Sequence, residues 1–104
     1  MKKIINMKRY DSKKSELVST WSNGGHRSDF WHCTESLYRT SGGNWFLHGE
    51  GGPLTRFACA CEGGRMTTDG EDIVPITEDE VAAWLAEHDV EACERHFPKK
   101  LQDA

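Results

Sequence analysis

Glycine clusters divide the first three quarters of this chain into short pieces. They stand at 24–25, 42–43, 49–52, 63–64 and 70. Glycine is common in tight turns because it adopts backbone angles that other residues avoid. Short pieces with alternating apolar residues between such turns are typical of antiparallel strands. This spacing therefore predicts a sheet rather than a helical bundle.

Period-two alternation places the strands. We predict them at 3–7, 16–21, 35–40, 44–48, 54–61 and 73–76. Ser41-Gly42-Gly43 lies between two of these segments and predicts a hairpin. Leu17 and Trp21 are expected on one face of their strand, as are Trp45 and Leu47. We expect 49–52 to form a loop between strands.

The pattern changes at residue 77. Thr77 can cap a helix, and Glu80 stands three residues later, as a capping box requires. Val81, Trp84 and Leu85 then recur at helical spacing. A second short helix is predicted from Val90 to Phe97, because Pro98 disfavours continuation.

Together these patterns predict an α+β fold. We expect an antiparallel sheet of four to six short strands in a meander, with one main C-terminal helix packed on it and a short second helix. The 104 residues form a single domain, with 1–76 mostly β, 77–97 helical and 98–104 a tail. One core is expected to hold Trp45, Leu47, Val81, Trp84 and Leu85.

Charge is unevenly distributed along the chain. The formal net charge is −4. Residues 1–14 carry six Lys or Arg and one acid, whereas 69–94 carry ten acids and no Lys or Arg. The acidic segment is either a solvated helix face or a surface that complements a basic partner. Direct nucleic-acid binding is disfavoured by this acidity, and stays an alternative.

Composition also bears on the compartment. The chain has four cysteines, and no segment approaches the roughly 20 apolar residues of a membrane span. The polar residues Asn6, Lys8 and Arg9 interrupt the apolar run that a signal peptide would need. We therefore expect a cytoplasmic protein with reduced thiols and no membrane partner.

Two kinds of chemistry, zinc binding and catalysis, are possible interpretations of the Cys, His and acidic residues. The spacing of Cys59, Cys61, Cys93 and His96 would suit tetrahedral zinc, but small thiols also fill apolar cores. We expect no metal and no cofactor, and keep these four residues as the fallback ligand set. No nucleophile elbow, phosphate loop or paired-carboxylate motif is present, so we expect a protein that is not an enzyme.

Several stretches resemble one family as a set. They are 2–6, 8–11, 21–24, 28–30, Cys33, Glu35, 37–39, 44–52, 76–80, Trp84 and Phe97. Together they resemble a group of short proteins carried on phages, plasmids and conjugative elements of bacteria, a group with no settled activity. Its members often have Gly where this chain has Met7. The resemblance covers nearly the whole chain and is most specific in 37–52.

The resemblance implies a working class and a bacterial host cell. Small accessory proteins of phages often inhibit host defence systems stoichiometrically, anti-CRISPR proteins among them. We therefore expect a binding protein that blocks a nucleic-acid-processing defence complex through protein contacts. The alternative is a small nucleic-acid- or zinc-binding regulatory module. The expected partner-binding residues are Glu71, Asp72, Glu78, Asp79, Trp45, His48 and Glu50.

Overall fold

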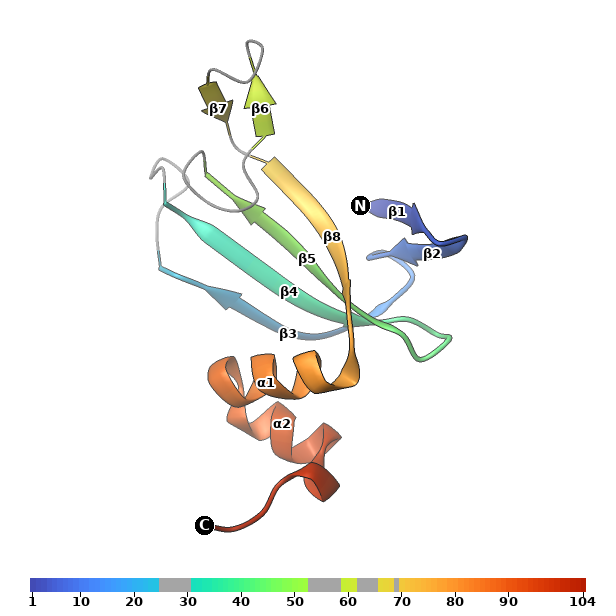
Figure 1. Cartoon of the computed structure of the whole chain (residues 1–104), viewed down its shortest axis with the longest axis vertical. Coiled ribbons are helices and arrows are strands. Elements are labelled where there is room, and N and C mark those ends of the chain that lie inside the picture. Colours follow the sequence, from blue (N-terminus) through green and yellow to red (C-terminus); the bar gives the residue numbers. More distant parts are fainter. Residues whose placement is uncertain (25–30, 53–58, 62–65, 69) are drawn as a thin grey trace.

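A four-stranded antiparallel sheet forms the centre of the molecule in the computed structural model (Figure 1). The structure describes residues 1–24, 31–52, 59–61, 66–68 and 70–104, the two short central ranges by their backbone. The sheet has the order β3-β4-β5-β8, formed by Glu16–Ser22, Cys33–Arg39, Trp45–Gly51 and Gly70–Ile76. Neighbouring strands follow one another along the chain, apart from the excursion between β5 and β8, so the predicted meander is confirmed.

Two hairpins lie outside this sheet. The first pairs β1 (Lys2–Ile5) with β2 (Lys8–Asp11), and the second pairs β6 (Cys59–Cys61) with β7 (Met66–Thr68). The sequence patterns did not predict β2 or β7, because both strands are short and lack apolar alternation. Residues 54–58 of the predicted strand 54–61 lie outside the described residues.

The C-terminal segment is helical as predicted. Helix α1 spans Glu78–His88 and α2 spans Val90–His96, followed by the 3-10 helix η2 at Pro98–Lys100. The Thr77 hydroxyl oxygen accepts a hydrogen bond from the backbone N–H of Glu80, and the backbone N–H of Thr77 donates one to the Glu80 carboxylate. The predicted capping box is therefore present. The predicted α+β class is confirmed. None of the helices within the described part has the length and apolar character that a membrane crossing needs.

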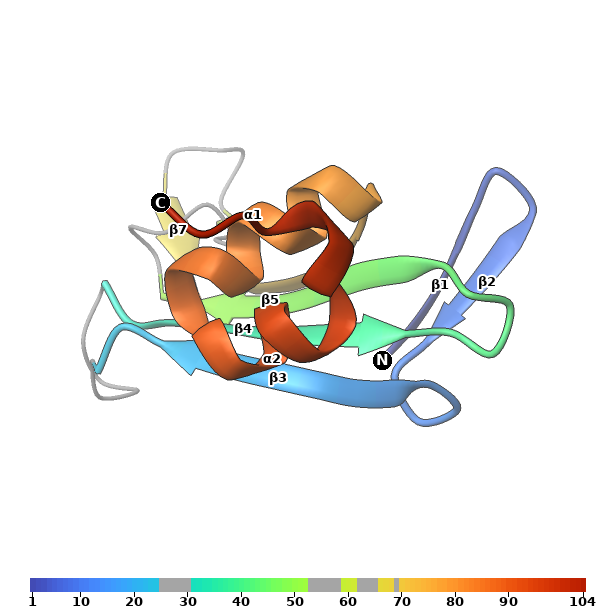
Figure 2. The ribbon, with the colours of Figure 1, turned by 90° about the horizontal axis from the view of Figure 1, so that it is seen from below.

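The two faces of the sheet carry different layers. The helices cover one face (Figure 2), where the predicted core residues Trp45, Leu47, Val81, Trp84 and Leu85 form one buried cluster with residues of β4 and α2. On the other face, Tyr10 of β2 packs edge-to-face on Phe46 of β5, at 5.6 Å between ring centroids. Alternation along β5 separates the layers, since Phe46 points opposite to Trp45 and Leu47.

Two local predictions are wrong. The pairing of β3 with β4 shifts between Leu17 and Ser19, so Leu17 is 54% exposed whereas Val18 and Trp21 both pack on the helical core. An extra residue of this kind in one strand makes the side chains before it point to the opposite face of the sheet from the one that simple alternation predicts. Residues 49–51 are not a loop but the end of β5. Because β5 pairs with β4 on one side and β8 on the other, tertiary pairing outweighs the turn preference of glycine there.

Candidate functional site

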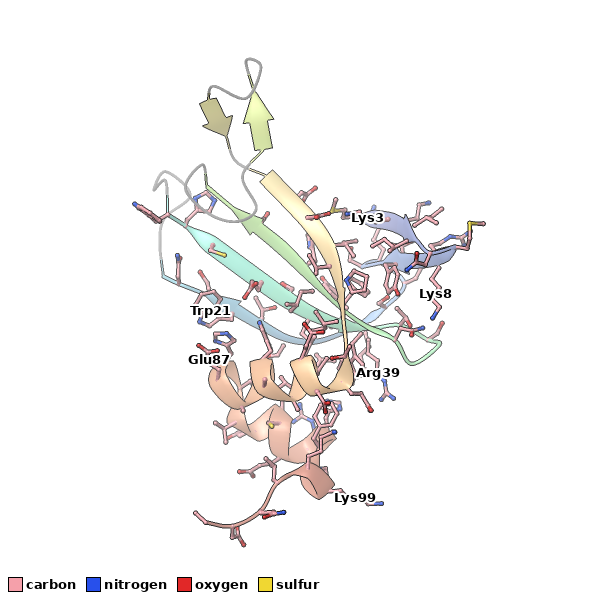
Figure 3. All side chains as sticks on the ribbon, viewed as in Figure 1. Lys3, Lys8, Trp21, Arg39, Glu87 and Lys99 are labelled. Carbon is pink, nitrogen blue, oxygen red and sulfur yellow. The ribbon has the colours of Figure 1, made fainter. Side chains whose placement is uncertain are left out.

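A pocket of about 440 Å³ lies between α1 and the helix-facing side of the sheet. Aliphatic side chains of β5 and β8 form part of its wall. Its polar and aromatic lining comes from strands β3 and β4 and from helix α1: Trp21, Cys33, Glu35, Glu80, Trp84, Glu87 and His88. Figure 3 shows Trp21 of β3 and Glu87 of α1 beside each other where the sheet meets the helix. Three carboxylates and two indoles therefore meet in one hollow.

The strand register explains why the pocket has room. Trp21, Glu35 and Gly49 stand side by side across β3, β4 and β5. Partners in one row point to the same face of a sheet. Gly49 has no side chain to place beside Glu35, so the row carries a bulky side chain at β3 and none at β5. The large side chains of α1 close the hollow from the other side.

Glu35 is the buried acid of the pocket. Glu35 is only 7% exposed, and its Oε1 accepts a hydrogen bond from Trp84 Nε1 at 3.3 Å. A carboxylate is rarely buried without compensating polar contacts, because removal from water costs several kcal/mol. Glu35 is therefore a costly residue to keep at a position that an apolar side chain could fill.

His88 lies between the two pocket tryptophans. Its ring centroid is 4.6 Å from that of Trp21 and 4.9 Å from that of Trp84. Its Nε2 is 3.9 Å from Glu87 Oε2. Three flat rings and an exposed carboxylate thus form the wall nearest the C-terminal end of α1.

Three of the predicted binding residues meet on the opposite side of the sheet. Glu50 of β5 pairs in register with Glu71 of β8. His48 Nε2 lies 3.1 Å from Glu71 Oε2, and the two side chains are 20% and 51% exposed. This pair occupies the Phe46 face, away from the pocket. The sequence did not predict this contact, because it placed His48 at the end of a strand and Glu50 in the loop that follows.

Asp72 is paired with the N-terminal hairpin. Lys3 Nζ lies 2.6 Å from Asp72 Oδ1, and both side chains are more than 40% exposed. The hydrogen bond from the Lys3 ammonium lowers the pKa of the Asp72 carboxyl below its ordinary value of 3.8, and the backbone N–H of Ile73 adds to this. Asp72 therefore connects β1 to β8 through this ion pair, which gives it a structural role.

Glu78 and Asp79 lie in the exposed first turn of α1. The positive end of the helix dipole favours acids there. Lys100 Nζ donates to Asp79 Oδ1 at 3.0 Å, and this contact raises the pKa of Lys100. Glu78 is exposed and forms no direct ion pair with Lys100, whereas Asp79 is partly neutralised by it.

Trp45 is not available to a partner as predicted. It is 5% exposed, because the end of α2 and the residue after it cover it: His96 meets its ring edge-on and Phe97 lies 5.9 Å away between centroids. The guanidinium of Arg39 lies 5.1 Å above the ring. The expectation of an exposed aromatic at a loop tip is wrong, because Trp45 begins a central strand whose side chain faces the helices.

The four fallback zinc ligands do not converge. Cys93 is buried in α2, where its thiol donates to Ala82 O at 3.7 Å, and His96 packs on Trp45. The strand that carries Cys59 and Cys61 lies at the far end of the long axis from α2 (Figure 1). The described residues contain no group of three or more potential ligands that could hold a metal ion.

The sequence reading missed the pocket, although a signal for it was present. Cys33, Glu35 and Leu37 alternate toward one face of a predicted strand whose neighbours on that face are apolar. An acid at such a core position is unusual enough to mark a site. Comparison with known proteins adds no second line of evidence: no protein-family model, curated protein or solved structure matches the chain.

Proposed function

We propose that this protein is a non-enzymatic binding protein that docks on a basic surface of a host macromolecule through its C-terminal helices. The partner class that fits best is a bacterial nucleic-acid-processing defence complex, which the protein blocks stoichiometrically and without turnover. The chain would compete there with nucleic acid for a positively charged channel.

One observation carries this proposal. Five exposed acids on the two helices form no ion pair with a Lys or Arg among the residues that the structure describes: Glu78, Glu80, Glu87, Glu91 and Glu94. Three of them suit the N-terminal ends of their helices, which accounts for their presence there without a partner. Glu87 and Glu94 have no such reason, since they follow the first turn. A charged surface of one sign steers association with a surface of the other sign.

The second candidate function is nucleic-acid binding by the basic N-terminal hairpin. The hairpin β1–β2 and the turn after it expose five basic side chains: Lys2, Lys8, Arg9, Lys13 and Lys14. Such a cluster can neutralise phosphates, so it favours a small nucleic-acid-binding module. Lys3 and Lys8 are visible on this hairpin in Figure 3, apart from the helices.

Affinity capture with matched charge variants separates the two candidates. The wild-type protein serves as bait in a lysate of bacteria, beside Glu78→Lys/Glu87→Lys/Glu91→Lys and the hairpin variant Lys2→Glu/Lys8→Glu/Lys13→Glu. We expect a near-stoichiometric protein partner whose activity falls in proportion to the amount of bait bound. The helix variant should lose it and the hairpin variant should keep it, with binding weaker at high salt.

Two results would overturn the proposal. One is the absence of any stoichiometric protein partner together with turnover of a nucleotide or peptide substrate. The other is binding to nucleic acid that depends on the hairpin lysines and not on the helix acids, which would establish the second candidate.

A further inference from the structure

A smaller pocket of about 210 Å³, the turn pocket, lies at the end of the sheet where β3 begins and β4 ends. Its lining comes from β2, from the turn between β2 and β3 and from the turn between β4 and β5: Arg9, Asp11, Lys14, Ser15, Thr40 and Ser41. Glu16 pairs in register with Arg39, so the residues just before β3 lie beside those just after β4. Both views place β2 and the β4–β5 turn at the same end of the sheet (Figures 1 and 2).

Hydrogen bonds hold both turns that form the walls of the turn pocket. In the first turn, Lys14 N donates to Asp11 O at 3.2 Å. In the second, Gly43 N donates to Thr40 O at 3.0 Å, and Asn44 N donates to Thr40 Oγ1 at 3.1 Å. The backbone around the lining residues is thus ordered before any ligand arrives, which lowers the cost of binding.

The turn pocket offers hydrogen-bond donors that the fold does not use. Arg9 and Lys14 are exposed, and neither forms an ion pair with a described residue. Thr40 Oγ1 accepts a backbone N–H, so its own hydrogen is not used in that bond. The Ser15 hydroxyl is already used, since it donates to Asp11 O at 2.7 Å. Two cations and one hydroxyl, from three segments of the chain, therefore line one space.

The charge and size of the turn pocket select the ligand. Arg9 and Lys14 bring two positive charges against one negative charge from Asp11, so the lining favours an anion. A guanidinium binds two oxygens of a phosphate at once, and a lysine ammonium binds phosphate as a point charge. The volume of about 210 Å³ is below the roughly 300–1,000 Å³ of small-molecule sites, so it fits one phosphate group rather than a whole nucleotide.

We infer that the turn pocket binds one phosphate group, with Arg9 and Lys14 on its oxygens and the Thr40 hydroxyl as a further donor. This inference goes beyond the proposed function, because the pocket is formed without α1 or α2. The phosphate belongs either to a small compound or to a nucleic-acid strand, and the chemistry of recognition is the same. Asp11 repels the anion and keeps the affinity low.

The test is an NMR titration of the ¹⁵N-labelled full chain with inorganic phosphate at constant ionic strength. Acetate is the matched ligand control, because it is an anion with two oxygens and a single charge. We expect saturable shifts of the backbone N–H signals of Lys14 and Ser41, with a dissociation constant on the order of millimolar. Acetate should bind at least about fivefold more weakly, because it cannot contact all the donors at once.

Variants locate the binding energy. Arg9→Gln and Lys14→Gln should each weaken phosphate binding by about three- to tenfold, since each removes a charge-assisted contact. Asp11→Asn keeps the acceptor for the Lys13 N–H and removes the opposing charge, so it should strengthen binding about two- to fivefold. A gain in affinity cannot come from a damaged fold. Lys8→Gln is the control and should change the affinity by less than about twofold, because Lys8 shares β2 with Arg9 but does not line the pocket.

A short oligothymidylate, compared with thymidine monophosphate, identifies the source of the phosphate. Binding of the strand that is at least about tenfold tighter, and that weakens in Arg9→Gln, assigns the site to a nucleic-acid backbone and favours the second candidate function. Equal binding of the two assigns the site to small phosphate compounds.

Equal binding of acetate, unchanged phosphate binding by folded Arg9→Gln/Lys14→Gln, or weaker binding by Asp11→Asn would each overturn the inference. Shifts confined to residues outside the turn pocket would also overturn it. The phosphate titration uses the isolated protein and no host component. It can therefore fail while a partner of the helices is still recovered, and it can succeed where none is recovered, so the two proposals are judged separately.

Discussion

The two layers on either side of the sheet differ in both packing and charge. Among the residues that the structure describes, the helical layer buries nine in one cluster, whereas the β1–β2 hairpin contributes to a cluster of three. The exposed charged residues of α1 and α2 are acids apart from Arg95, whereas those of the β1–β2 hairpin are bases. The same sheet thus supports a well-packed acidic side and a lightly packed basic side. A binding surface needs a rigid support, so the comparison favours the helical side as the functional one.

Truncation of the helical core should have the largest effect. Trp84→Ala removes a buried indole and its bond to Glu35, and we expect a loss of about 3–5 kcal/mol in the free energy of unfolding. Urea denaturation followed by circular dichroism measures this. A loss below about 1 kcal/mol would mean that the helical layer is not the better packed one.

The equivalent truncation on the hairpin side should cost less. Tyr10→Ala removes the main contact of β2 with Phe46, and we expect a loss of about 1–3 kcal/mol. The small cluster can relax around the missing ring, and the helical core is not touched. Amide exchange should show the hairpin opened and α1 still protected. Global unfolding of both layers together would contradict the division.

The hairpin turn should be open to improvement. Asn6 and Met7 both have positive φ, 52° and 63°, as a two-residue type I′ turn requires. Methionine is strained in that region and Met7 is 94% exposed, so it gains little from packing. Met7→Gly should raise the free energy of unfolding by about 0.5–1 kcal/mol. Asn6→Gly is the control, and it should bring no gain, because asparagine tolerates this conformation.

The smallest effect should be that of the pair between the hairpin and the sheet. Because Lys3 lowers the pKa of Asp72, the pair stabilises the fold above pH 3.8 and loses this contribution as the pH falls through the lowered pKa. Both groups are well exposed, so we expect less than about 1 kcal/mol. Lys3→Met should therefore be less stable than wild type at pH 7 and equal to it near pH 2. A difference that persists at low pH would exclude the ion pair as its cause, and Lys2→Met is the control.

Local signals predicted the helical side better than the hairpin side. Thr77 and Glu80 form a capping box that depends on four residues, so its position could be read directly. Strand β2 has a single buried residue, Tyr10, and no such signal. The burial of Trp45 and the strand conformation of Gly49 depend on pairing with β4 and β8, which no local pattern encodes. The pocket could not be predicted for the same reason, because Trp21, Glu35 and Gly49 come from three different strands and become neighbours only when these strands pair.

The central claim is that partners bind the helical side and not the hairpin side. Carboxylate footprinting of the protein, free and in the complex recovered from lysate, tests it most directly. Chemical labelling of Glu78, Glu87 and Glu91 should fall several-fold in the complex, while labelling of Asp11 on the hairpin stays unchanged. Protection of Asp11 with the helix carboxylates still fully labelled would contradict the account.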